Sequence, residues 1–385
     1  MKGRAGLYVN NINGYSSFIP SKLPPNPPLV IDSEILELLS LADRKLGRLD
    51  GISELLPNPE LFIAMYVKKE ALLSSQIEGT QASLVDVLDI DNTDKQESTI
   101  SNVGDVVNYV AAMNHGLERL NDFPLSLRLI REIHEILLRG TRGSNLSPGE
   151  FRKSQNWIGP QGCTLANATF IPPTVPEMLQ AMGDLELFMH DEESQIPALI
   201  KIAYIHAQFE TIHPFLDGNG RIGRLMITFW LCQQRILSQP LLYLSYFFKL
   251  NRTEYYDRLM DIRFKGAWEN WVKFFLKGVS DVSDEAIDTA RKILILKDKY
   301  IELLSKIESA SNNLPLFNKL FTFPIITRIH VVEHLNVTSP TAGTIIENFC
   351  SLGILKDITP DRKRNKKYAF SEYLAIFEKG TENYS

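Results

Sequence analysis

The chain has 385 residues, and its hydrophobic content of 44% is typical of packed globular protein. This length exceeds one typical domain, so two or three domains are expected. The net charge of −5 disfavours a chain devoted wholly to nucleic acid, although charge can be segregated by domain. The longest apolar run, roughly residues 225–232, is too short to span a bilayer, and no apolar signal segment follows the first residues. We therefore expect a cytoplasmic protein that does not enter a membrane.

Helical patterns dominate the chain after an N-terminal arm. The first 30 residues are rich in Pro, Asn and Ser, as in SKLPPNPPLV, and are expected to lie extended on the body. From Ser33 onward, apolar residues recur at spacings of three and four, which indicates helices. This pattern is broken once, in NWIGPQGCTLANATFIPP, where Gly, Pro and Asn separate short β-prone runs in the manner of a hairpin. A long amphipathic helix is expected over residues 283–309, with Ile307 on its apolar face.

The C-terminal part of the chain shows a different pattern. Two or three short helical segments precede KDITPDRKRNKKYAFS, a charged hairpin flanked by β-prone residues, which together predict a winged helix-turn-helix. The wing DRKRNKK carries five cations and one acid, but the expected recognition helix SPTAGTIIENFCSLG has few basic residues. Two interpretations stay open: the domain binds DNA, or it contacts a target protein or a second copy of the chain in a homodimer.

The segment HPFLDGNGRIGR, residues 213–224, combines one histidine, one acid, three glycines and two arginines. Its glycines fit G-x-G-x-x-G, but no strand precedes them and no acid follows at the required distance, so a dinucleotide-binding fold is not supported. Glycines before a helix free backbone N–H groups to face an anion, and the helix N-terminus adds partial positive charge. We therefore interpret the segment as a cradle for phosphate.

Charged side chains around this cradle indicate chemistry on a nucleotide. Arg221 and Arg224 lie three residues apart, on one side of the new helix, where their guanidinium groups can bind further phosphate oxygens. Asp217 lies beside the cradle, where phosphate repels an acid unless a divalent cation bridges them, and Mg²⁺ is the natural choice. His213 ends the preceding helix and can accept a proton near neutral pH. A base beside a bound triphosphate suggests activation of a hydroxyl for attack on phosphorus.

The same segment matches the signature HPFx[D/E]GNGRxxR at every defining position, and on these residues the chain resembles the Fic family of nucleotidyltransferases. The likeness extends over roughly residues 61–279, including GEFRKSQNWIG, TFIPP and NRTEYYDRL. It implies an all-α Fic fold with a small β-hairpin flap, and transfer of AMP from ATP to a Ser, Thr or Tyr hydroxyl of a target protein, which includes the protein itself. The expected domains are an arm and helical region over 1–110, a Fic core over 111–280, a linking helix over 281–312 and a winged helix-turn-helix over 313–385.

The resemblance also implies roles for individual residues. His213 becomes the base that deprotonates the target hydroxyl, and Asp217 becomes the Mg²⁺ ligand. The start of the new helix would bind the α and β phosphates, and Arg224 would bind the γ phosphate. The ATP-binding residues that the resemblance implies are Gly218, Asn219, Gly220, Arg221, Ile222, Gly223 and Arg224.

Two further groups of residues are expected to contact the substrates. Tyr255 and Tyr256 fall in the stretch where relatives contact the adenine or ribose. The flap would present its edge to an extended target segment, which would bind through main-chain hydrogen bonds. The flap residues expected to do so are Thr169, Phe170 and Ile171.

A second motif lies upstream, in the helix ELFIAMYVKKEALLSSQIEGTQ. Glu78 falls in its last turn before Gly79, where a carboxylate faces the negative end of the helix dipole, at a cost of roughly 0.3–1 kcal/mol unless a cation compensates. Ser74 lies four residues earlier on the same face. Ser-x-x-x-Glu-Gly resembles the inhibitory motif of Fic proteins whose blocking helix precedes the core. The resemblance implies that Glu78 pairs with Arg224 and denies the γ phosphate its partner; in some relatives the same glutamate helps to remove AMP from the target.

The leading hypothesis is therefore an autoinhibited protein adenylyltransferase, and two alternatives stay open. A transferase of the same fold could use another donor and transfer UMP or phosphocholine. A DNA-binding regulator could use its Fic core only to sense nucleotide, but the intact His213 disfavours this, because binding needs the cradle and not the base.

Overall fold

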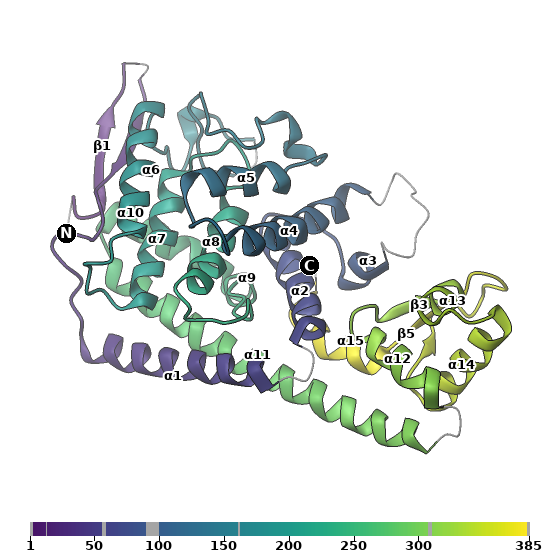
Figure 1. Ribbon diagram of the computed structural model, residues 1–385. Helices are drawn as coiled ribbons and strands as arrows, with labels where there is room; N and C mark the ends of the chain where they lie inside the picture. Colours follow the sequence, from purple (N-terminus) through teal and green to yellow (C-terminus); the bar gives the residue numbers. More distant parts are fainter. Residues whose placement is uncertain are drawn as a thin grey trace.

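The computed structural model describes residues 3–382 apart from 13, 56–58, 90–99, 161 and 307–309. Helices dominate the described residues, as the sequence predicts, and strands are few and short (Figure 1). The helices are α1 (Ser33–Leu55), α2 (Pro59–Ile77), α3 (Leu84–Asp89), α4 (Ile100–Arg119), α5 (Leu127–Leu137), α6 (Val175–Met189), α7 (Ala198–Ile212), α8 (Asn219–Gln233), α9 (Ser245–Leu250), α10 (Arg252–Lys265), α11 (Trp268–Ser305), α12 (Ala310–Leu320), α13 (Arg328–Leu335), α14 (Ser339–Ser351) and α15 (Ser371–Glu378). The strands are β1 (Gly6–Asn10), β2 (Ser16–Pro20), β3 (Ile325–Thr327), β4 (Lys356–Asp357) and β5 (Lys367–Ala369).

The centre of the helical body is the pair α7 and α8. Every residue of α7 from Leu199 to Ile212 is buried, and α8 is buried along most of its length. A helix that is enclosed on all sides needs no polar face, which explains the long apolar stretches of both segments. Helices α4, α5, α6 and α11 pack around the pair. The loop between α7 and α8, residues 213–218, is therefore held at both ends by the core.

The N-terminal arm is more ordered than the sequence predicts, because it begins as a β-hairpin. Strands β1 and β2 pair antiparallel, with Gly6 opposite Pro20, and β2 contacts α6 and α7. Arg4 fixes the arm to the body: it forms an ion pair with Glu269 at 2.9 Å and donates to the carbonyl oxygens of Pro27 and Pro28 at 2.7 and 2.8 Å.

Helix α11 joins the body to the C-terminal unit. It runs without interruption for 38 residues, so the expected linking helix is the second half of a helix that begins inside the core. Its first half lies beside α1, as Figure 1 shows, and α12 and α15 also contact it. Ile287, Ala290, Ile293 and Leu304 are buried, as the apolar pattern predicts. Ile307 lies outside the described residues.

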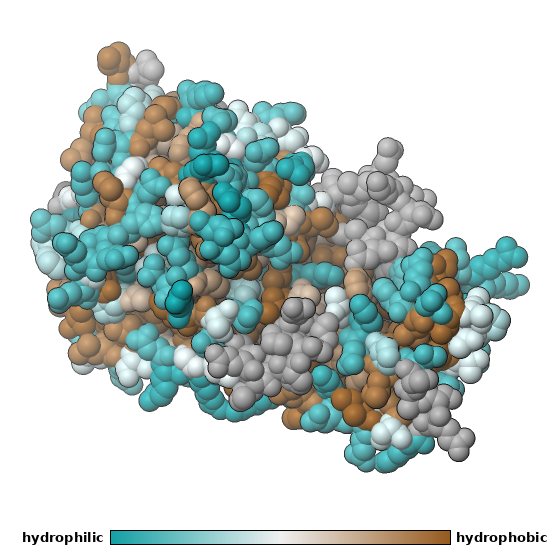
Figure 2. Space-filling model, viewed as in Figure 1, coloured by the Kyte–Doolittle hydropathy of each residue, from teal (hydrophilic) through white to brown (hydrophobic). Residues whose placement is uncertain are grey.

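The C-terminal unit, residues 310–382, contains a three-stranded antiparallel sheet in the order β3-β5-β4, and its buried apolar residues continue the core of the body. Four aromatic rings pack together in this unit, with centroids of neighbouring rings 5.0–5.9 Å apart: Phe317, Phe321, Phe370 and Tyr373. On the face shown in Figure 2, hydrophilic side chains cover most of the helical body and hydrophobic ones gather in patches on this unit. Among the described residues, no helix has both the length and the apolar character needed to cross a membrane.

Arg4→Met should destabilise the protein, because it removes a buried cation, leaves three carbonyl groups without this donor and leaves Glu269 without its ion pair. Breaking a buried ion pair from one side typically costs about 3–5 kcal/mol, and Glu269 is partly exposed, so we expect a loss of about 2–4 kcal/mol in urea unfolding. The matched control is Lys22→Met, whose exposed pair with Asp184 should contribute less than about 1 kcal/mol. Equal effects of the two changes would contradict the role assigned to Arg4.

Candidate active site

His213 ends α7 in a left-handed backbone conformation, with φ 51° and ψ 61°. Its N–H still donates to Phe209 at 2.9 Å, so the helix hydrogen bonding continues up to this residue. Its carbonyl oxygen accepts from Arg152 Nε and from Asn156 Nδ2, both at 3.1 Å. A non-glycine residue with positive φ is uncommon and persists where its surroundings fix it, which these contacts do. The backbone at His213 thus sets where the imidazole points.

The imidazole of His213 is held in its neutral form. Burial lowers its pKa to about 3, and the nearby guanidinium groups of Arg263 and Arg152 act in the same direction, while the backbone of Glu210 and the carboxylate of Glu78 oppose them. At neutral pH the ring is therefore uncharged. An uncharged imidazole is the form that can accept a proton from a hydroxyl.

The turn into α8 is shaped by the side chain of Asn219. Its Oδ1 accepts from the N–H of Phe215 at 2.9 Å, and its Nδ2 donates to the carbonyl of Phe215 at 2.8 Å. Asn219 therefore fixes the loop, and its backbone rather than its side chain is placed to meet a ligand. Ile222 is buried in the core, and its N–H donates to Gly218 at 3.0 Å. The N–H groups of residues 219–221 precede this first helical hydrogen bond and lie where a helix binds anions.

His134 supports the loop from the opposite side. Its ring stacks on Phe215 with centroids 3.7 Å apart. The N–H of Gly149 donates to Nδ1 at 2.9 Å, so the proton lies on Nε2, which donates to the carbonyl of Asp217 at 3.0 Å. Burial lowers the pKa of His134 to about 4, which keeps this neutral tautomer at physiological pH.

Arg224 and Glu78 form an ion pair, as the sequence predicts. Arg224 Nη2 lies 2.7 Å from Glu78 Oε1, while Ser74 accepts from Arg224 through its hydroxyl at 2.8 Å and its carbonyl at 3.0 Å. The arginine side chain is 2% exposed and the glutamate side chain 37%. Burial alone would raise the pKa of Glu78, but the guanidinium groups of Arg224 and Arg221 lower it below its usual value. The glutamate is therefore an anion at neutral pH.

The carboxylate of Glu78 also lies against the start of α8. A Cβ atom built on Gly220 would collide with Glu78 Oε1 and would lie 3.1 Å from Arg224 Nη1. Only a glycine at this position lets the carboxylate approach the helix so closely. Gly79, with φ 97°, ends the segment that carries the glutamate. Glu78 thus occupies the end of α8 where an anion is favoured.

Asp217 lies on the exposed side of the cradle, and Arg221 is buried beside it. Arg221 reaches Asp105 at 3.4 Å and Asp217 at 3.5 Å, and Thr80 donates to Asp105 at 3.3 Å. Asp217 is 42% exposed, and its Oδ1 accepts from Gly218 at 2.7 Å. The described residues contain no group of three or more ligands that could hold a metal by themselves. A single carboxylate beside a phosphate cradle nevertheless fits Mg²⁺, which usually binds through one or two carboxylates together with substrate phosphates.

The two tyrosines proposed for the adenine or ribose lie in different surroundings. Tyr255 is 1% exposed, and its hydroxyl lies 2.9 Å from Nε2 of His206, whose Nδ1 lies 3.0 Å from the carbonyl of Gly223. It belongs to the core behind α8. Tyr256 is 37% exposed, and the Arg252 guanidinium lies 5.2 Å from its ring. Of the two, Tyr256 is placed to touch a ligand.

The flap is fixed by a single antiparallel bridge. Phe170 and Ile158 exchange both backbone hydrogen bonds, at 2.8 and 3.0 Å, and the carbonyl of Ile171 accepts from the N–H of Phe18 in β2. Phe170 is buried, with the guanidinium of Arg263 4.2 Å from its ring. Of the three expected docking residues only Thr169 is exposed. The N-terminal hairpin therefore already uses one main-chain group of the flap.

Sequence reasoning missed several residues that build the site. Arg152 and Asn156, which bind the His213 carbonyl, lie inside the quoted stretch GEFRKSQNWIG but received no role. Glu70 and Glu210 are buried carboxylates, and burial raises the pKa of each to about 7 against the lowering effect of Arg224. Glu70 accepts from Tyr109 at 3.1 Å and from Ser245, whereas Glu210 faces Gly223. Nothing in their sequence spacing distinguishes these two glutamates from surface ones.

The comparisons with known families agree with this arrangement. Residues 36–118 match the family described as Fic/DOC family N-terminal, and residues 124–231 match the Fic/DOC family. The first region contains Glu78 and the second contains the whole loop from His213 to Arg224. The chain is a Fic domain protein, which confirms the inference from the signature.

Individual relatives are distant in sequence. The chain is 27% identical over 248 residues to the protein adenylyltransferase Fic of Aedes aegypti, covering 63% of this chain and 45% of that protein. It is 27% identical over 192 residues to a probable protein adenylyltransferase of Aquifex aeolicus, covering 49% and 54%. The chain thus spans about half the length of these curated relatives.

Solved structures resemble the chain in fold. A Fic family protein from Desulfovibrio desulfuricans G20 has a TM-score of 0.59 at 20% identity, covering 89% of this chain and 97% of that chain. A Fic domain containing signaling protein from Bacteroides thetaiotaomicron has a TM-score of 0.51 at 17% identity, covering 67% and 97%. The helical fold described above is therefore a Fic fold.

Glu210→Gln tests the buried carboxylate. A carboxyl whose pKa is raised from about 4.5 to about 7 by folding destabilises the folded state progressively as pH rises between these values, because only the unfolded state then loses its proton. We expect the variant to exceed wild type in free energy of unfolding by about 1–3 kcal/mol at pH 8 and to match it at pH 5. Urea titrations at both pH values measure the difference. A gap that is larger at pH 5 would contradict the assignment.

Proposed function

We propose that the protein is an autoinhibited protein adenylyltransferase, which transfers AMP from ATP to a Ser, Thr or Tyr hydroxyl of a target protein. The observation that carries this proposal is the ion pair between Glu78 and Arg224. It lies at the start of α8, next to the loop that begins at the neutral His213. The names of the curated relatives support adenylyl transfer as the reaction.

The geometry suggests how each residue would act. The backbone N–H groups at the start of α8, together with Arg221, would hold the α and β phosphates of ATP, and Arg224 would hold the γ phosphate. The target hydroxyl oxygen attacks the α phosphorus and forms a new bond to it. The bond from this phosphorus to the bridging oxygen breaks, and pyrophosphate leaves with the electron pair. His213 accepts the proton of the hydroxyl.

Asp217 is the residue that would hold Mg²⁺, together with phosphate oxygens of the nucleotide. When bound, the ion neutralises phosphate charge and orients the leaving group. The hydrogen bond from Gly218 fixes one oxygen of Asp217, and the second oxygen lies 3.5 Å from the guanidinium of Arg221. This carboxylate is the protein ligand that we assign to the ion.

Autoinhibition follows from competition for one guanidinium. Arg224 already binds Glu78 and Ser74, so the γ phosphate lacks its partner and the α phosphate is not aligned for in-line attack. The collision of Glu78 with any Cβ at Gly220 supports the same idea, because the carboxylate lies on the path of the phosphates. The same glutamate is the candidate to orient a water molecule for removal of AMP from a modified target.

We propose the exposed edge at Thr169 as the place where the target docks on the flap. We further infer that the C-terminal unit is a winged helix, with the turn between β4 and β5 as its wing. Lys366 and Lys367 of this wing pair with Asp357 and Asp89, and α14 contains no lysine or arginine. These contacts favour a protein-binding role, in a homodimer or with a target, over the alternative of a nucleotide-sensing DNA regulator.

Glu78→Gly should raise AMP transfer to protein hydroxyls, the protein's own included, because Arg224 becomes available to the γ phosphate. A charged hydrogen bond contributes about 1.5–3 kcal/mol, so we expect an increase of about 10- to 100-fold. Intact-mass analysis after incubation with ATP and Mg²⁺ measures the adenylyl group. Adding His213→Ala to the variant should abolish the transfer.

The same assay separates the alternatives. Transfer from UTP or a choline-containing donor instead of ATP would indicate a different donor for the same chemistry. No adenylyl mass on any protein, with a folded Glu78→Gly variant, would refute the proposed reaction.

A further inference from the structure

The turn that carries Glu78 is held by Gln76. Helix α2 ends one residue before Glu78, and the N–H of Gly79 donates to the carbonyl of Gln76 at 3.0 Å. The side-chain Nε2 of Gln76 donates to the carbonyl of Ala82 at 3.0 Å, so the same residue holds the turn through its backbone and its side chain. Gln76 is buried, and a buried amide that loses its partners is costly. The position of Glu78 is therefore coupled to that of Gln76.

The chain directly after α15 binds the same glutamine. Nε2 of Gln76 also donates to the carbonyl of Thr381 at 3.0 Å, and its Oε1 accepts from Lys249 Nζ at 2.7 Å. This ammonium is buried and donates further to the carbonyls of Gly380 and Glu382, at 2.8 and 2.5 Å. Buried donors need acceptors close by, because water does not replace them. A polar network thus joins this segment to the last turn of α2.

Gly380 lets the segment approach α9 closely. Its φ of 81° lies in the region that favours glycine, and a Cβ atom built on it would collide with the ring of Tyr246. Tyr246 and Lys249 both belong to α9. A larger residue at position 380 would therefore push the segment away from the ammonium that binds it.

A second contact lies one turn earlier, in α15. The ring of Phe377 meets Tyr66 of α2 edge to face, with centroids 5.6 Å apart, and both side chains are buried. Residues 377–382, which we call the clamp, thus contact α2 at two places along its length.

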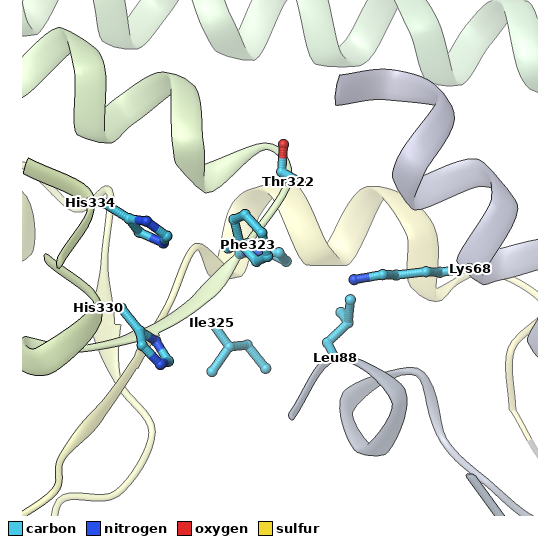
Figure 3. Close-up of a pocket in the computed structure, with 8 residues that line it drawn as sticks. Lys68, Leu88, Thr322, Phe323, Ile325, His330 and His334 are labelled. Carbon is cyan, nitrogen blue, oxygen red and sulfur yellow. The ribbon is translucent and has the colours of Figure 1, made fainter. Parts of the chain in front are cut away.

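The C-terminal unit is less closely packed where it faces the middle of α2 and the end of α3. A cavity of about 260 Å³ lies there, with Lys68 and Leu88 on one side and Phe323, His330 and His334 on the other (Figure 3). Side chains that face a void lack the dispersion contacts that close packing supplies. The unit can therefore shift here at a lower cost than within a core of normal density.

We propose that the clamp keeps Glu78 at Arg224, and that a displacement of the C-terminal unit withdraws the clamp and raises AMP transfer. The clamp stabilises one position of the turn after α2, so any influence that favours the displaced unit shifts the population towards the other position. The regulatory half of this inference rests on the proposed function. The mechanical half, in which the clamp orders residues 76–82, does not.

Gly380→Ala in the full chain tests the mechanical half by amide hydrogen exchange. Its methyl group should push the segment away from α9. Exchange over residues 76–82 should then become about 5- to 100-fold faster, as expected for the loss of one buried hydrogen bond, while exchange in α7 stays unchanged. Gly353→Ala is the matched control, because Gly353 also has a positive φ, 74°, but a Cβ atom there meets nothing within 4 Å.

Lys249→Met loosens the clamp from the side of α9 and should speed the same exchange, even where Tyr246 yields to the methyl group of the first variant. Wild-type exchange over residues 76–82 in both variants would overturn the clamp. Equal acceleration by Gly353→Ala would do so too. An equal rise in α7 in both variants would have the same meaning, because the effect would then be a general loss of stability.

AMP transfer tests the regulatory half. Gly380→Ala should raise transfer above that of wild type, and it should add nothing to Glu78→Gly, because the glutamate through which the clamp acts is then absent. Faster exchange without a rise in transfer, in a protein whose Glu78→Gly variant is active, would overturn the regulation. An inactive Glu78→Gly variant would count against the proposed function alone, since hydrogen exchange needs no catalysis.

Discussion

The buried cation of Arg224 is the interaction on which the site depends. Its guanidinium lies in the core between α2 and α8, where an unpaired charge would cost several kcal/mol. Ser74 and Glu78 supply the acceptors in this structure. A nucleotide that binds this guanidinium must replace these acceptors with oxygens of its own, and a phosphate group can do so. Under the proposed function, the segment that follows α2 and the nucleotide therefore compete for one arginine.

Three glutamate side chains lie near this arginine. Glu70 and Glu210 are buried near it in addition to Glu78, and burial raises the pKa of the first two to about 7. Only Glu78 contacts the guanidinium directly, and its pKa is lowered. Arg224 thus favours the ionised form of Glu78 more than that of Glu70 or Glu210. His213 is neutral because burial lowers its pKa. The charges in this site are therefore set by burial as much as by residue type.

The sequence was sufficient for the parts of the fold and site that depend on local order. The helical periodicity predicted a mostly helical body, and residues 213–224 predicted a turn into a helix with its arginines on one side. Asn219 shows the limit: its type suited a phosphate, but its side chain closes the loop on Phe215. Tyr255 and Tyr256 are adjacent in sequence, and only packing decides that the first lies in the core.

Contacts between distant segments that no motif marks were beyond the reach of pattern analysis. The hydrogen bond from Gln76 to Thr381 joins residues 305 positions apart, and a buried glutamine carries no periodic signal. The N-terminal hairpin was expected to be an extended arm. Its prolines and asparagines are common in extended segments and in hairpin turns alike, so they do not separate the two. Glu70 and Glu210 could not be told from solvated glutamates, since burial of an acid is decided by the neighbours that enclose it.

The continuity of α11 has a mechanical consequence. At about 1.5 Å per residue, its 38 residues span roughly 57 Å without a hinge. A tilt of about 5° at the end that lies in the core would therefore displace the far end by about 5 Å, more than any hydrogen bond can stretch. A small change in the packing of α1 against α11 would thus become a larger displacement of the C-terminal unit, and a displacement of that unit would change the packing in the core.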